Sequence, residues 1–208
     1  MELSGWKRSL VYYADWALKL MYVNLLWILG NFVGLVVLGF FPSTIAMFSV
    51  IRKWLQGEDF NTFTHFKEVF KKELIKGNLY GFIWVILGFI VYFDLQFFRY
   101  FSNIPSLLLT YFTFILGVIY VLGLLFAFPV YVNFELKTIQ YLKNTLFLVL
   151  SQPIVAIIMA LGFYIPYYLM IKIPGLLPFF CGSLIAFCLM IISMKLFTRL
   201  EKKENKGL

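Results

Sequence analysis

Apolar stretches long enough to cross a lipid bilayer follow one another through this chain, and they constrain its fold more than any other feature. A helix needs about 20 apolar residues to span the ~30 Å hydrocarbon core. Hydrophobic residues make up 62% of the chain and charged residues only 13%, against about 25% charged residues in soluble domains. The sequence therefore predicts an all-α, polytopic helical membrane bundle, multi-pass in the cell membrane, with residues 1–208 forming a single transmembrane helical domain.

Five or six membrane-inserted helices and one amphipathic surface helix account for the hydropathy pattern. The first apolar run, residues 20–55, would be ~54 Å long as one helix, which is too much for tilt alone to accommodate. Pro42 interrupts this run, with Gly39 before it and Ser43 after it, a pattern that predicts a turn and a new helix start. The expected inserted helices are residues 20–40, 43–56, 79–98, 105–134, 146–170 and 176–197.

The distribution of Lys and Arg bears on the number of crossings, because cytoplasmic loops carry an excess of these residues. Six of the 18 lie between Arg52 and Lys76, which predicts that this segment is cytoplasmic. Six crossings with both termini inside would leave only Arg99 and Lys172 outside. Five crossings would also place the cations of the N-terminal segment outside. The charge bias thus favours six crossings and leaves five as the alternative.

Residues 62–76 have the pattern of a basic amphipathic helix on the cytoplasmic side. Its apolar residues, Phe66 and Phe70 among them, recur at spacings of three and four. Lys67, Lys71 and Lys72 lie mainly on the other sides and are candidate contacts with lipid or with a partner. We expect the helix to lie along the inner membrane surface, with a partner-binding surface as the alternative.

Polar and small residues inside the first apolar run predict a helix-packing seam. Asn24 and Asn31 are seven residues apart and share a helix face, and Gly30 with Gly34 forms a small-xxx-small surface that allows close helix approach. The functional alternative is a substrate-lined groove that Gln152 would complete. Interhelical hydrogen bonding explains the same residues and is the preferred interpretation.

Few residues carry signals for other kinds of chemistry. The net charge is +8, but the basic residues fall in short runs between apolar segments, which favours contact with anionic lipid over nucleic acid. Cys181 and Cys188 have no His or carboxylate neighbours to complete a metal site, and the single histidine, His65, is interpreted as solvated. No activated nucleophile or carboxylate pair is recognisable. We expect no catalytic residue, no cofactor, no metal and no enzymatic activity.

One segment resembles a known family. The run Phe41-Pro42-Ser43-Thr44-Ile45-Ala46-Met47-Phe48, followed by Arg52-Lys53-Trp54-Leu55-Gln56-Gly57-Glu58, is more specific than hydrophobicity alone would produce. Together with Phe70-Lys71-Lys72-Glu73 and Asn78 it resembles the YesL family of bacterial membrane proteins, closely between about residues 20 and 83. Members usually have Ala where Ser43 stands.

The resemblance implies uncharacterised integral membrane proteins, mostly of Gram-positive bacteria, often encoded near carbohydrate uptake transporters. It carries over no catalytic or ligand-binding residue. We expect an accessory membrane protein linked to carbohydrate uptake, with the lipid bilayer and ABC transporter permease subunits as its partners. A small membrane transporter is the second hypothesis, and a membrane enzyme is the third.

Arg52, Lys53 and Trp54 are the candidate partner or lipid contacts in the most distinctive part of this resemblance. An interfacial anchor, with Trp54 at headgroup level and both cations inside, explains the residue types. The functional hypothesis is that the planar Arg52 guanidinium grips a carboxylate or phosphate in two places, which Lys cannot reproduce. Lys53 would then only set orientation.

Overall fold

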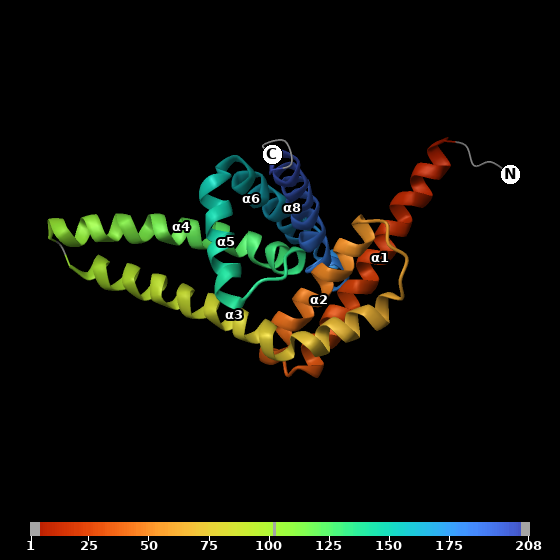
Figure 1. The fold of residues 1–208 in the computed structure, drawn as a ribbon, viewed down its shortest axis with the longest axis horizontal. Helices are drawn as coiled ribbons and strands as arrows, with labels where there is room; N and C mark the ends of the chain where they lie inside the picture. The colour runs from red at the N-terminus through yellow and green to blue at the C-terminus, as the bar shows by residue number, and fades with distance from the viewer. Residues whose placement is uncertain (1–4, 102, 205–208) are drawn as a thin grey trace.

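The computed structural model describes residues 5–101 and 103–204, and every regular element in these residues is a helix (Figure 1). The all-α prediction is therefore confirmed. The helices, in chain order, are α1 (Gly5–Val33), α2 (Val37–Leu55), α3 (Thr62–Tyr100), α4 (Ile104–Asn133), α5 (Thr138–Ser151), α6 (Pro153–Lys172), a 3-10 turn (Pro174–Leu176), α7 (Leu177–Phe180) and α8 (Ser183–Glu204).

Five of the described helices are long and apolar enough to cross a membrane, which confirms a multi-pass membrane protein. These helices are Ser9–Val33, Thr62–Tyr100, Ile104–Asn133, Pro153–Lys172 and Ser183–Lys202. Many of their large apolar side chains are exposed on the molecular surface, as expected where lipid is the solvent. The 19 residues of α2, whose last turn carries Arg52 and Lys53, are not among the five.

The expected turn at Pro42 is wrong, because the first apolar run breaks earlier. The chain turns between α1 and α2 at residues 34–36, where Leu35 and Val36 have positive φ angles of 54° and 65°. Pro42 lies inside α2. A proline has no amide hydrogen, so the carbonyl four residues earlier, that of Leu38, loses its intrahelical donor.

A side chain from α3 replaces that donor. Asn78 Nδ2 donates to the Leu38 carbonyl oxygen at 2.8 Å and also to the Leu74 carbonyl oxygen of its own helix at 2.6 Å. In lipid, a proline inside a helix is tolerated where a neighbouring helix satisfies the freed carbonyl in this way. The tertiary contact thus overrides the local turn signal of Gly39, Pro42 and Ser43.

The expected boundary between the amphipathic helix at 62–76 and the span at 79–98 is also wrong, because α3 is continuous through both. Asn61 begins this helix by accepting a hydrogen bond from the Thr64 amide at 2.9 Å. One buried face runs through the join at spacings of three and four, which keeps the helix packed on α2 across Gly77. Its members are Phe66, Phe70, Glu73, Gly77, Gly81 and Trp84. Phe66 and Phe70 therefore pack inside the bundle.

The second half of the chain differs from expectation mainly in where the helices begin and end. The helix expected at 105–134 is α4. The segment expected as one span at 146–170 is divided at Gln152, because Pro153 occupies the first position of α6, where a proline is accommodated. The helix expected at 176–197 starts later, at Ser183, after the 3-10 turn and α7.

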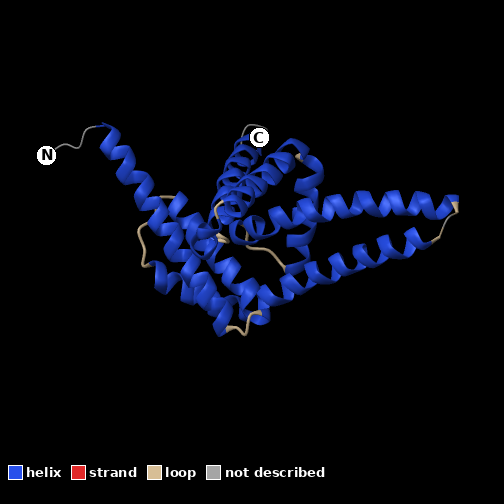
Figure 2. Cartoon of the chain, turned by 180° about the vertical axis from the view of Figure 1, so that it is seen from behind, coloured by secondary structure: helices blue, strands red, loops and turns tan. Residues whose placement is uncertain are grey.

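The core centres on α2, which packs against α1, α3, α4 and α8. Ten of its residues are buried, including the run from Pro42 to Phe48. The outer half of the hairpin formed by α3 and α4 instead projects from the rest of the bundle, as Figures 1 and 2 show.

The Asn78–Leu38 contact generates a test by double-mutant cycle. Asn78→Ala leaves the Leu38 carbonyl without a donor, so we expect it to lower the free energy of unfolding by ~1–3 kcal/mol. In a Pro42→Ala background the new amide at position 42 can donate to Leu38, so the same substitution should cost clearly less. Thermal unfolding of the purified protein in detergent measures both. Equal costs in the two backgrounds would contradict the assignment.

Candidate functional site

The predicted seam residues lie at two different contacts. Gly30 of α1 and Gly34 of the following turn face Ser43 and Gly39 of α2, and a Cβ atom on Gly34 would overlap the Gly39 Cα. The two helices can therefore approach to backbone contact, as small-xxx-small surfaces allow. This contact holds the α1–α2 hairpin closed beside the turn.

Asn24 and Asn31 play different parts, although they share a helix face. Asn24 is fully buried, and its Nδ2 donates to the Pro178 carbonyl oxygen of α7 at 3.0 Å. Its Oδ1 accepts from the Gly182 and Ser183 amides at 3.0 and 3.1 Å and so caps the start of α8. Asn31 Nδ2 donates to the Trp27 carbonyl oxygen within α1. Of these two asparagines, Asn24 is the one whose side chain ties α1 to other helices.

Arg52 lies where α2 ends beside the C-terminal end of α4. Its Nε donates to Asn133 Oδ1 at 3.2 Å, and no other hydrogen bond of its guanidinium is found among the described residues. Lys53 pairs with Glu58 at 2.9 Å and lies over the Phe60 ring. The Arg52 guanidinium is thus held in place through its Nε by Asn133. The charge of Lys53 is already neutralised by Glu58.

Aromatic and imidazole side chains surround this end of α2. Trp54 contacts Trp16 of α1 edge-on, with ring centroids 6.4 Å apart. His65 is half-buried, and its Nε2 lies 2.9 Å from Ser49 Oγ of α2. The interpretation of His65 as a solvated residue is therefore wrong: it joins α3 to α2.

The three predicted cations of α3, Lys67, Lys71 and Lys72, are exposed. No described hydrogen bond or ion pair connects them to Arg52. The candidate contact residues therefore form two groups in the structure. One lies at the C-terminal end of α2, and the other forms an exposed basic face on α3.

A buried carboxylate on α3 is a site that the sequence interpretation missed. Glu73 is 9% exposed, and Tyr131 Oη of α4 donates to its Oε2 at 2.6 Å. The rings of Tyr80 and Tyr141 stack around Tyr131, with centroids 4.8 and 4.5 Å away. Burial raises the pKa of Tyr141, whose hydroxyl donates to the Phe134 carbonyl oxygen at 2.8 Å. Glu73 could have been found from its register, seven residues after Phe66 on the same helix face.

An apolar groove of about 420 Å³ lies on the projecting part of the α3–α4 hairpin. Gly88 and Gly117 lie on its two walls, where the Tyr120 side chain occupies the space beside Gly88 and Val91 lies beside Gly117. We call it the hairpin groove, and its lining residues are Gly88, Val91, Tyr92, Leu95, Phe114, Gly117, Val118, Tyr120, Val121 and Leu122.

Neither cysteine is placed as an activated nucleophile. Cys181, between α7 and α8, is half-buried, and this burial raises the pKa of its thiol. Cys188 lies within α8 and is also half-buried. A thiol whose pKa is raised has less thiolate at neutral pH and reacts more slowly.

Residues 20–95 match a family model described as "Protein of unknown function, DUF624". The chain is similar to three uncharacterized proteins of Bacillus subtilis (strain 168). It is 33% identical to YteU over 97% of this chain and 91% of that protein, and 32% identical to YesV over 91% of each. It is 32% identical to YesL over 95% of this chain and 94% of that protein. No solved structure matches it significantly.

The unequal roles of the two asparagines lead to a matched prediction. Asn24→Ala removes the cap of α8 and the bond to α7, leaving buried backbone groups unpaired, so we expect a loss of ~1–3 kcal/mol in the free energy of unfolding. Asn31→Ala removes a bond within one helix and should change stability by less than ~0.5 kcal/mol. Thermal unfolding in detergent compares them. Similar losses for both variants would show that Asn24 has no special role.

Proposed function

The chain belongs to the YesL-type family of uncharacterised proteins, and from this premise we propose that it is an accessory membrane protein of the cell membrane that assembles with permease subunits for carbohydrate uptake. The family resemblance supports the link to carbohydrate uptake. The shape and chemistry of the α3–α4 hairpin support lateral assembly. The proposal assigns no enzymatic step to the chain.

The observation that carries the proposal is the projecting half of the hairpin. Beyond Trp84, α3 presents exposed apolar side chains on several sides, including Phe89, Phe93 and Phe97, whose rings stack with successive centroids 6.4 Å apart. The part of α4 that runs beside it in Figure 2 also exposes large apolar side chains, such as Leu108 and Phe112. Such an arm offers a large apolar surface to another membrane protein.

The hairpin groove supplies a place where a partner helix would fit closely. Helices associate in lipid through tight packing at small residues, because lipid and helix surfaces are equally apolar. Gly88 and Gly117 provide small residues on the two walls of this groove, and Val118 and Val121 are exposed beside them. The proposed occupant is one transmembrane helix of the permease.

Arg52 provides a second, polar contact in this proposal. Its Nε is engaged by Asn133, which fixes the plane of the guanidinium. The two terminal nitrogens can then receive a carboxylate of the partner in a bidentate geometry. Lys keeps the charge but cannot reproduce this fork.

Affinity purification of the tagged full-length protein from its native membranes tests the proposal. Wild-type protein should recover permease subunits, and Val121→Trp, which fills the hairpin groove, should reduce their recovery severalfold. Leu116→Trp places the same indole side chain at an exposed position of α4 outside the groove and serves as the control. Arg52→Lys should also weaken recovery, whereas Lys53→Arg should not.

The outcomes separate the proposal from its alternatives. Equal recovery of permease subunits by Val121→Trp and wild type would show that the hairpin groove is not part of the interface. A wild-type protein that recovers no permease subunit from membranes containing them would overturn the accessory role.

A small transporter is the second candidate, and Glu73 is the observation that favours it. An ionisable group inside a membrane bundle is costly and commonly marks a transport or proton pathway. The one described hydrogen bond to this carboxylate comes from a neutral tyrosine hydroxyl.

The transporter hypothesis predicts a different response from the same protein. A transported sugar should raise the melting temperature of the purified protein on its own, because it binds only the folded state. Glu73→Gln keeps the size of the side chain and a hydrogen-bond acceptor for Tyr131, so it should remain folded and lose this stabilisation. A stabilisation that survives Glu73→Gln would exclude Glu73 from the sugar site.

A further inference from the structure

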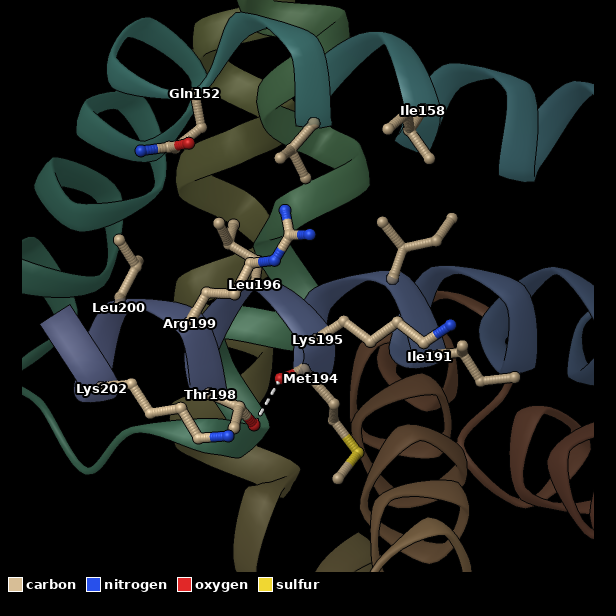
Figure 3. A pocket seen from close by; sticks show the side chains of 12 residues that line it. Gln152, Ile158, Ile191, Met194, Lys195, Leu196, Thr198, Arg199, Leu200 and Lys202 are labelled. Atoms are coloured by element: carbon tan, nitrogen blue, oxygen red, sulfur yellow. Dashed lines mark hydrogen bonds between the residues drawn. The ribbon is translucent and has the colours of Figure 1, made fainter.

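A second groove, of about 920 Å³, lies between α6 and the C-terminal half of α8 (Figure 3). Val155 and Ile158 of α6 and Ile192 and Leu196 of α8 contribute apolar walls. Gln152, at the junction of α5 and α6, stands at one end. We call this space the α6–α8 groove.

Three cations line the same groove from α8. Lys195, Arg199 and Lys202 are separated by four and three residues, so they form one stripe along a helix face. All three are exposed, and Figure 3 shows Arg199 directed from α8 toward the α6 side of the groove. A basic stripe therefore borders an apolar hollow.

None of these cations has a carboxylate partner within the described residues. The ion pairs found there join Lys19 to Asp15 and Lys53 to Glu58, both on other elements. Lys195 and Arg199 nevertheless belong to a helix apolar enough to cross the membrane. A cation in such a helix is costly unless it reaches water or an anion near the bilayer surface.

We propose that the α6–α8 groove binds one phospholipid with an anionic headgroup. The headgroup phosphate accepts hydrogen bonds from Arg199 and Lys195, and Lys202 adds positive charge at the end nearer the bilayer surface. An acyl chain occupies the hollow beside Ile158 and Ile192. Basic pockets between transmembrane helices recognise anionic lipids through this combination of contacts.

The composition of the groove favours a lipid over a free phosphate ion. A free ion would use the basic stripe alone and leave the apolar walls exposed to water. A phospholipid matches both parts of the groove. Its phosphate can lie beside the cations while its acyl chain lies beside the apolar walls. This site is separate from the hairpin groove and does not depend on the accessory role proposed above.

The test uses the full-length protein in a neutral maltoside detergent and follows its thermal unfolding. Added dioleoylphosphatidylglycerol should raise the melting temperature in a concentration-dependent way, because a ligand of the folded state stabilises it. Dioleoylphosphatidylcholine and inorganic phosphate should have little effect. An equal shift with phosphatidylcholine, or a full shift with inorganic phosphate, would overturn the proposal.

Two matched variants separate a site from general surface charge. Lys195→Gln/Arg199→Gln should weaken the apparent affinity for phosphatidylglycerol about 30-fold, from ~1 kcal/mol per cation near anionic lipid and a tenfold change per 1.4 kcal/mol. Lys143→Gln/Lys172→Gln removes two exposed cations outside the groove and should change it less than about threefold. Equal weakening by both pairs would show non-specific attraction.

The proposed position of the acyl chain in the apolar half of the groove is tested separately, with a substitution that changes no charge. Ile158→Trp adds bulk where the acyl chain is placed and should weaken phosphatidylglycerol binding severalfold. Each variant is first melted without lipid, so that any loss of folding is seen separately. Unchanged binding by Ile158→Trp, in a variant that folds, would overturn the placement of the acyl chain.

Discussion

The Leu38 carbonyl imposes a constraint on which the packing of this bundle depends. Pro42 removes its intrahelical donor, and Asn78 of α3 supplies the replacement. In the hydrocarbon region no water is present to do so. The bond fixes α3 against α2 close to the turn after α1, through two residues that lie 40 positions apart.

The position of α2 extends this constraint to the rest of the molecule. It is covered by α1, α3, α4 and α8. Gly39 lets α1 approach it closely, and Gly77 and Gly81 of α3 do the same for α3. Where α2 ends, Arg52 reaches α4 and Ser49 meets His65 of α3. Arg52, Lys53 and Trp54 are thus attached to α2 itself. The hairpin groove lies between α3 and α4, which both pack on α2, and the α6–α8 groove has one such helix, α8, as a wall.

Hydropathy was sufficient to predict the fold class, because length and lack of charge alone decide which segments can enter a bilayer. It could not locate the first turn, since Leu35 and Val36 carry no turn signal and the signal at Pro42 is overridden by Asn78. The role of Asn24 depends on partners 154 to 159 residues away, which no local pattern indicates. The helical spacing of buried residues could have predicted that Glu73 is buried. The two grooves could not be predicted in this way, because each is formed by side chains of two separate helices.

The continuity of α3 joins two environments in one unbroken element. At 1.5 Å per residue its 39 residues extend ~58 Å, and Gly77 and Gly81 lie against Ile45 and Phe41 of α2. The half before this contact carries exposed lysines, and the half after it projects with exposed apolar side chains. Because no loop separates the two halves, the depth of the projecting half in the bilayer also sets the height of the lysine-bearing surface.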